Sequence, residues 1–185
     1  FCNEAKQLLE EVTALSDRIE LSVFDVQENA EVANQFKVTN APGIVIAAKD
    51  NAEVTNLGIQ FSGIPSGHEF STLINDILIV SKRDSGLDAK TREFLKNLDK
   101  PLHLQVFVTP TCPYCPRAVL LAHQMAMENP QMITAEGVEA TEFVVRLIPC
   151  FVVDVVVQPR FGDEILAGDF DARALGERHR QVAVE

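Results

Sequence analysis

Two cysteines at the junction of a predicted strand and a predicted helix limit the folds open to this chain of 185 residues. Residues 102–108 alternate apolar and polar side chains and then become wholly apolar, as a strand does on entering a core. Residues 117–128 carry apolar side chains at helical spacing, with no Gly or Pro. Cys112 and Cys115 therefore lie where the strand gives way to the helix.

This position favours redox chemistry at the cysteine pair. At a helix N-terminus, free N–H groups and a partial positive charge favour a thiolate, so Cys112 is the predicted attacking sulfur. Cys115, one turn further in, would resolve the mixed disulfide. Pro113 pre-sets the first helical turn, and Tyr114 either stacks on a substrate or shields the sulfurs. A C-x-x-C beside a strand and a helix predicts thioredoxin-like chemistry.

Composition narrows the classes of function. A hydrophobic fraction of 46% is enough to build a core, and the net charge of -11 argues against nucleic-acid and anionic-membrane partners. No apolar run approaches the roughly twenty residues of a membrane-spanning helix, and the start lacks a signal-peptide pattern. We expect a soluble, cytoplasmic protein.

The cysteine count argues against a bound metal. The four cysteines at positions 2, 112, 115 and 150 include one close pair, whereas structural zinc needs four ligands, usually in two close pairs. They are also too few and too unevenly spaced for a disulfide-stapled secreted fold. We therefore expect no metal and no cofactor other than the redox-active cysteine pair.

The first half of the chain is predicted to alternate helices and strands. Its elements, by residue range, are a helix at 5–15, a strand at 20–26, a helix at 28–36, a strand at 44–48, a turn at 49–52, an antiparallel strand at 53–61, a loop at 62–67 and a helix at 68–80. The side chains expected on the apolar stripes of the first and last helices are Ala5, Leu8, Leu9, Val12 and Leu15, and Phe70, Leu73, Ile74, Ile77 and Leu78.

The second half repeats this order. Its predicted elements are a helix at 88–98, the strand at 102–108, the helix at 117–128, a strand at 132–140 with a polar interruption at 136–137, strands at 150–157 and 164–167, and a helix at 171–180. Three anchors pair between the halves, namely Cys2 with Cys115, Pro42 with Pro149, and Gly63 with Gly168.

The repeat predicts an α/β protein of two tandem thioredoxin-fold, glutaredoxin-like units, each a mixed central sheet flanked by helices. The predicted units are residues 1–85 and 86–185. The pairing makes Cys2 the second cysteine of a C-x-x-C, which predicts that the first unit is N-terminally incomplete. The second unit has fewer residues between cysteine and proline, and the shortfall falls on residues 141–147.

Two X-Pro bonds, at Pro42 and Pro149, are predicted to be cis, since cis is cheap only before proline. Pro149 would then lie against the sulfurs and leave the backbone of Ile148 free to pair with a substrate. Ala41 and Pro42 would serve in the same way in the first unit. The alternative for both prolines is an ordinary loop-to-strand position.

The motif Cys112-Pro-Tyr-Cys115-Pro, preceded by Val-Thr-Pro-Thr, and the stretch at 61–70, Phe-Ser-Gly-Ile-Pro-Ser-Gly-His-Glu-Phe, resemble the glutaredoxin-like protein disulfide oxidoreductases of thermophilic archaea and bacteria. The resemblance runs nearly end to end. It implies two thioredoxin folds, each with its own C-x-x-C, that reduce, oxidise or isomerise disulfides. The chain is also similar to ordinary glutaredoxins and to the N-terminal donor module of flavoprotein peroxiredoxin reductases. Cys2 favours the two-site family, from which Cys150 departs.

The predicted function is that of a thiol-disulfide oxidoreductase acting on protein disulfides. The alternative is an electron-relay module between a thioredoxin-reductase-like flavoprotein and a peroxiredoxin. A third hypothesis, an iron–sulfur centre held by Cys112 of two chains, is disfavoured by Pro113 in similar proteins. The roles of Cys150, His68, His123 and Asp154 stay open at this point.

Overall fold

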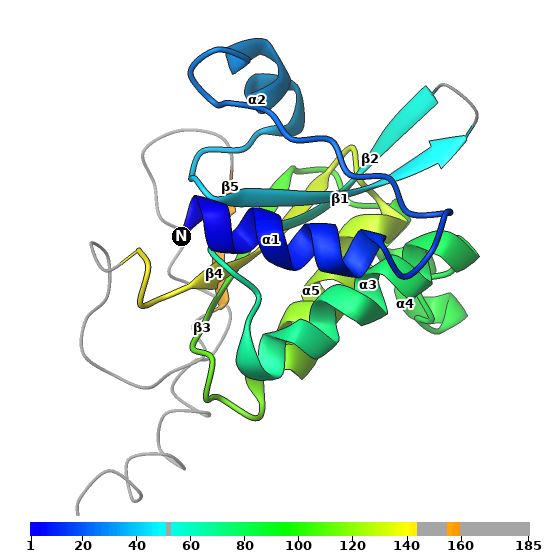
Figure 1. Ribbon diagram of the computed structural model, residues 1–185. Coiled ribbons are helices and arrows are strands. Elements are labelled where there is room, and N and C mark those ends of the chain that lie inside the picture. The colour runs from blue at the N-terminus through cyan, green and yellow to red at the C-terminus, as the bar shows by residue number, and fades with distance from the viewer. Residues whose placement is uncertain (51–52, 144–154, 160–185) are drawn as a thin grey trace, which may run out of the picture.

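The computed structural model describes residues 1–50, 53–143 and 155–159, and these form a mixed β-sheet with helices packed against it (Figure 1). Its strands are β1 (Gly43–Asp50), β2 (Glu53–Ser62), β3 (Leu102–Val108), β4 (Ile133–Glu139) and β5 (Val155–Pro159). They lie in the order β1-β2-β4-β3-β5. The predicted α/β class is confirmed.

The strand pairing joins the two halves of the chain in one sheet. β1 and β2 form the predicted antiparallel hairpin, and β3 pairs antiparallel with β5. β4 is parallel to β3 on one side and to β2 on the other, where Ile59 to Ser62 pair with Ala135 to Val138. The division into two units at residue 85 stays a prediction, but a strand from each side of it contributes to the same sheet.

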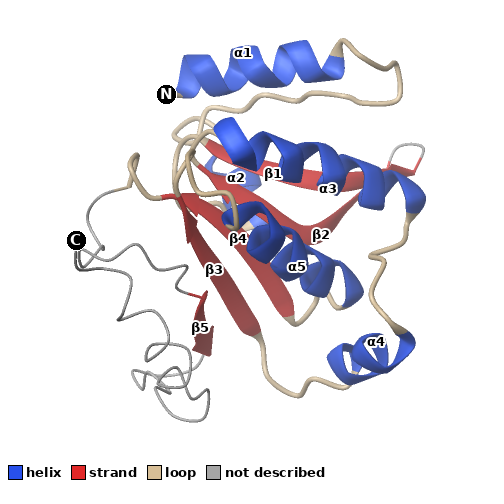
Figure 2. Ribbon diagram, turned by 90° about the horizontal axis from the view of Figure 1, so that it is seen from below, coloured by secondary structure: helices blue, strands red, loops and turns tan. Residues whose placement is uncertain are grey.

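The helices of the described chain are α1 (Cys2–Thr13), α2 (Ala30–Phe36), α3 (Phe70–Lys82), α4 (Ala89–Lys96) and α5 (Cys115–Glu128), with a 3₁₀ turn, η1 (Gly67–Glu69), before α3. Figure 2 shows α3 and α5 side by side over one face of the sheet, where they contact each other. Asp88 caps the N-terminus of α4, and its carboxylate accepts hydrogen bonds from the backbone N–H groups of Lys90 and Thr91.

The packing of α5 on the sheet depends on a glycine. A Cβ atom at Gly137 of β4 would lie 3.0 Å from Cγ1 of Val119 and 3.2 Å from Cδ1 of Phe61, so a larger residue would require these side chains to shift. Val119 and its neighbours Val106 and Ala135 are completely buried. The close approach therefore places the start of α5 directly at the end of the central strands.

The opposite face of the sheet carries a buried carboxylate. Glu136 of β4 is 3% exposed and accepts hydrogen bonds from Ser62 and from Gln105, the latter at 2.9 Å, while His103 Nε2 lies 3.3 Å away. Asn40 Nδ2 also donates to it, at 3.4 Å. The predicted polar interruption does not break the strand. β4 continues through Glu136, and the carboxylate of Glu136 is hydrogen-bonded.

One predicted strand is wrong. Residues 20–26 form no strand, and Val23 and Phe24 are 60% and 53% exposed. Their β-branched and aromatic composition favours a strand only where a neighbouring strand supplies hydrogen-bond partners. In the described part of the chain, β1 pairs with β2 alone.

Two predicted apolar stripes need correction. Leu15 lies beyond the end of α1 and is 77% exposed. On α3, Phe70 and Leu78 are exposed, whereas the polar Thr72 and Asp76 are buried with Leu73. The face of α3 toward α5 is therefore partly polar, a property that apolar spacing does not reveal.

Several predictions fall outside the described residues. These are Ile148, the cis bond at Pro149, Gly168, the roles of Cys150 and Asp154, the strand at 164–167 and the helix at 171–180. Of the strand predicted at 150–157, the described part belongs to β5. Within the described residues, no helix is long and apolar enough to cross a membrane.

Glu136 should stabilise the fold in a pH-dependent way. Burial raises its pKa, but hydrogen bonds from His103, Ser62 and Gln105 outweigh burial and lower the pKa from 4.5 to about 2. A depressed carboxyl pKa stabilises the fold above the unfolded value, so the contribution of about 3 kcal/mol should be lost as the pH falls from 4.5 to about 2. Urea unfolding of the wild type and of Glu136→Gln across this range measures it. A difference between the two proteins that does not change with pH would contradict the assignment.

Candidate redox site

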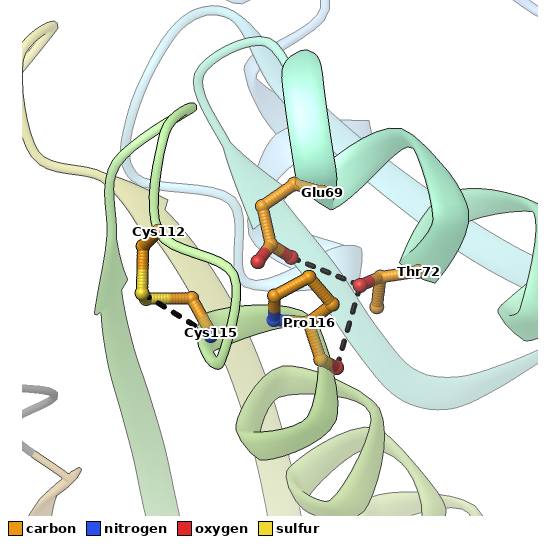
Figure 3. The surroundings of a disulfide bond; sticks show 5 residues. All are labelled: Glu69, Thr72, Cys112, Cys115 and Pro116. Carbon is orange, nitrogen blue, oxygen red and sulfur yellow. Dashed lines mark hydrogen bonds between the residues drawn. A yellow bond between two sulfur atoms is a disulfide. The ribbon is translucent and has the colours of Figure 1, made fainter.

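The predicted cysteine pair lies at the junction expected from the sequence. β3 ends at Val108, a short loop follows, and α5 begins at Cys115. Cys112 and Cys115 form a disulfide with their Cα atoms 5.6 Å apart. The backbone N–H of Cys115 donates to Sγ of Cys112 at 3.2 Å (Figure 3). This donor is one of the free N–H groups at the start of α5, and it would stabilise a thiolate on Cys112 after reduction.

The two sulfur-bearing residues differ in exposure. Cys115 is 3% exposed and belongs to the core, whereas Cys112 is only partly buried. Beside it, Pro113 is exposed, and Tyr114 is 81% exposed at the residue preceding α5. An incoming thiol or disulfide can therefore reach Cys112 far more easily than Cys115. Tyr114 does not cover the disulfide, which favours the alternative in which its ring is free to contact a substrate.

A buried carboxyl lies near the first turn of α5. Glu69 ends the turn η1 and is 2% exposed, and its side chain points toward the first turn of α5 (Figure 3). Its Oε2 accepts a hydrogen bond of 3.0 Å from the hydroxyl of Thr72, and Oε1 has no hydrogen-bond partner in the described structure. The loop that carries Glu69 is held to the cysteine loop by a hydrogen bond of 3.1 Å from His68 N–H to the carbonyl of Pro110.

The environment of Glu69 favours its neutral form. Burial raises its pKa from 4.5 to about 7, against smaller lowering effects of the Thr72 hydrogen bond and of His123, and Asp76 adds to the rise. A carboxyl with this pKa can take up and release a proton near neutral pH. A buried acid–base group is thus linked through the Thr72 hydroxyl to Pro116, in the first turn of α5.

A second buried pair links α3 to α5. Asp76 and His123 are both completely buried, and Asp76 Oδ2 lies 2.7 Å from His123 Nδ1. His123 Nε2 faces the backbone carbonyl of Gln60 at 3.1 Å, so this nitrogen must carry a proton. The ring also makes an edge contact with Phe61. Burial raises the pKa of Asp76, and the charge and hydrogen bond of His123 oppose the rise.

The remaining predicted site residues lie apart from the disulfide. The Ala41–Pro42 bond is cis, as predicted, and the carbonyl of Pro42 accepts from Gly63 N–H at 2.9 Å. Cys2, the first residue of α1, is an exposed free thiol. Through the register of β1, β2, β4 and β3, the start of β1 lies at the same end of the sheet as the cysteine loop, three strand spacings or roughly 14 Å away.

Sequence reasoning assigned no role to Glu69, Thr72 or Asp76. They occur at i, i+3 and i+7 and so share one helical face, which Leu73 also borders. The available signal was that these three polar residues recur at helical spacing beside Leu73. The sequence leaves the role of His123 open, and the structure makes it a buried partner of Asp76.

Comparison with known proteins supports a redox class. No protein-family model matches the chain. The alkyl hydroperoxide reductase proteins AhpF of Staphylococcus epidermidis and of Staphylococcus aureus are 33% identical to it over 130 and 129 residues. These matches cover 70% of this chain and 22% of each relative, so the chain spans about a fifth of the length of these curated proteins.

Two solved structures resemble the fold. A protein disulfide oxidoreductase from Aeropyrum pernix superposes with a TM-score of 0.73 at 28% identity, over 85% of this chain and 73% of that one. The alkylhydroperoxide reductase protein AhpF from Enterococcus faecalis gives 0.69 at 27% identity, over 87% and 78%. The mixed sheet, the disulfide at the start of α5 and these likenesses place the chain among thioredoxin-like redox proteins.

The described residues contain no group of three or more His, Cys, Asp or Glu side chains that could hold a metal ion.

Replacing His123 with Leu should lower the free energy of unfolding by about 3–5 kcal/mol at neutral pH, because Asp76 would be left buried without its partner. The loss should shrink at low pH, where Asp76 takes up a proton. Urea unfolding at both pH values tests this. Asp76→Asn is the matched control, since its amide can still donate to Nδ1 and should cost clearly less. Equal, pH-independent losses in both variants would contradict the ion-pair explanation.

Proposed function

We propose that this chain is a thiol-disulfide oxidoreductase that exchanges disulfides with protein substrates through Cys112 and Cys115. The observation that carries the proposal is the asymmetric disulfide at the start of α5, with Cys112 accessible and Cys115 3% exposed. The similarity to a protein disulfide oxidoreductase supports it.

The exchange proceeds in two steps that balance electrons and protons. The thiolate of reduced Cys112 attacks a substrate disulfide, forms a mixed disulfide and releases the first substrate thiolate. Cys115 then loses its proton and attacks Cys112 Sγ, which reforms the internal disulfide and releases the second substrate thiolate. Two electrons pass from the cysteine pair to the substrate, and the reverse sequence oxidises a substrate dithiol.

Glu69 is proposed as the group that receives the proton of Cys115. A buried thiol is a poor source of thiolate in an apolar environment, so its attack needs a nearby base. Glu69 is the buried carboxyl that faces the first turn of α5, and its pKa of about 7 leaves part of it ionised at neutral pH. When the Cys112–Cys115 disulfide is reduced, Glu69 returns the proton to Cys115.

A second candidate function is electron relay from a thioredoxin-reductase-like flavoprotein to a peroxiredoxin. The sequence similarity to the alkyl hydroperoxide reductase protein AhpF favours it. A relay should exchange slowly with insulin and rapidly with one partner protein, whereas a general oxidoreductase should show no such preference. In either case we propose that Cys2 and the Ala41–Pro42 turn belong to a second exchange site at the same end of the sheet, in the tandem arrangement inferred from the sequence.

Cys112→Ser should abolish the acceleration of insulin reduction by dithiothreitol, because the attacking thiolate is lost. Cys115→Ser should instead accumulate a mixed disulfide on Cys112, since the resolving thiol is missing. Turbidity follows the first variant and intact-protein mass the second. The wild type is the control for the mass measurement, because Cys115 can resolve its mixed disulfide by reforming the Cys112–Cys115 bond. If Cys112→Ser accelerated insulin reduction as much as the wild type does, the assigned roles would be refuted.

Glu69→Gln should slow resolution of the mixed disulfide by about tenfold or more at pH 7, because an isosteric amide cannot accept the proton of Cys115. The wild-type rate should rise with pH through about pH 7, the pKa of Glu69, whereas the variant should lack this rise. Single-turnover kinetics from a preformed mixed disulfide isolates the step. An unchanged pH profile would remove Glu69 from the mechanism and leave the cysteine roles intact.

A further inference from the structure

We propose that Thr72 is a positioning residue that passes the protonation state of Glu69 to the first turn of α5, by switching the direction in which its hydroxyl donates. This inference rests on the proposed role of Glu69 in disulfide exchange. It adds a residue that touches neither the sulfurs nor a substrate.

The hydroxyl of Thr72 lies between two acceptors. Oγ1 is 3.0 Å from Oε2 of Glu69 and 3.4 Å from the backbone carbonyl oxygen of Pro116 (Figure 3). A hydroxyl has one proton to donate, so it can satisfy one of these acceptors at a time. Thr72 is 1% exposed, and this burial leaves little access for solvent to stand in for the missing bond.

The proton on Glu69 decides which bond forms. When Glu69 is ionised, both of its oxygens are acceptors, and the Thr72 hydroxyl donates to Oε2. When Oε2 carries a proton, Glu69 donates to Oγ1 of Thr72, and the Thr72 proton is free to turn to the carbonyl of Pro116. Pro116 directly follows Cys115 in the first turn of α5. The protonation state of the carboxyl therefore decides whether the Thr72 hydroxyl donates to the carbonyl of Pro116, the residue after the resolving cysteine.

The bond to the ionised form has a direct consequence for proton transfer. It stabilises the carboxylate against the effect of burial, which lowers the pKa of Glu69. Without this bond the carboxyl would hold its proton to higher pH. A smaller fraction of Glu69 would then be ionised at neutral pH and able to accept the Cys115 proton. No electron is transferred in the switch, and the one proton involved moves between Cys115 and Glu69.

Other charged or titratable groups face Glu69, and they remain in every Thr72 variant. Asp76 on α3 and His123 on α5 act on it electrostatically, and Glu139 of β4 lines the same small cavity. The Thr72 hydroxyl, by contrast, acts on Oε2 through a direct hydrogen bond. A change at Thr72 thus isolates the hydrogen bond from the surrounding charges.

The test compares Thr72→Val, which is nearly isosteric but has no hydroxyl, with Thr72→Ser, which keeps it. In single-turnover resolution of the mixed disulfide, Thr72→Val should move the pH of half-maximal rate upward by about one unit, because a hydrogen bond to a charged group is lost. Thr72→Ser should keep the wild-type profile. Thr55→Val, on an exposed position of β2, makes the same chemical change away from the site and should leave the profile unmoved.

A second measurement does not depend on activity. ¹³C NMR titration of the Glu69 carboxyl in the oxidised full chain should show the same upward shift in Thr72→Val and none in Thr72→Ser. If Thr72→Val does not fold, Thr72→Ala carries the same expectation. An unshifted Glu69 titration in a folded hydroxyl-free variant would overturn the proposal. If the wild type exchanges no disulfides, the proposed function fails, while the titration still decides the role of Thr72.

Discussion

The parallel pairing of β2 with β4 is the contact on which the candidate site depends. It sets four residues of the first half of the chain against four of the second, from Ile59↔Ala135 to Ser62↔Val138. β2 continues into the loop that carries Glu69, and β4 supports α5 through Gly137. Because β2, β4 and β3 are parallel, the loop after β2 and the cysteine loop after β3 leave the same end of the sheet, and the carboxyl of one half lies near the first turn of α5 in the other.

This arrangement changes what the predicted division at residue 85 means for function. The disulfide lies entirely after that boundary, whereas Glu69, Thr72 and Asp76 lie before it. The second half alone would keep the cysteines, the helix dipole and the N–H donor to Cys112, but it would lose the buried acid–base group. With the role proposed for Glu69, the two halves share one site as well as one sheet.

Elements set by local patterns were predictable, and partnerships across the chain were not. The strand at 102–108, the hairpin, the helix at 117–128 and the cis bond before Pro42 follow from periodicity and residue type, and the structure confirms them. Residues 20–26 have the composition of a strand but no neighbouring strand to pair with, so composition alone predicts a strand that does not form. The partner of Asp76 lies 47 positions away, and no local pattern could have identified it. The polar face of α3 was visible in the sequence, yet its meaning depended on which helix covered it.

Two buried glutamates on opposite faces of the sheet show how environment separates a structural role from a chemical one. Glu136 is surrounded by donors from two strands and a loop, and their hydrogen bonds lower its pKa to about 2, so it stays ionised and holds the strands together. Glu69 has one donor and an unpartnered oxygen, and burial raises its pKa to about 7. A core under selection for stability alone would favour an apolar or amide side chain at the second position, because an under-partnered buried carboxyl costs free energy. Its position near the first turn of α5, with the Thr72 hydroxyl beside it, fits the proton transfer that we propose for disulfide exchange.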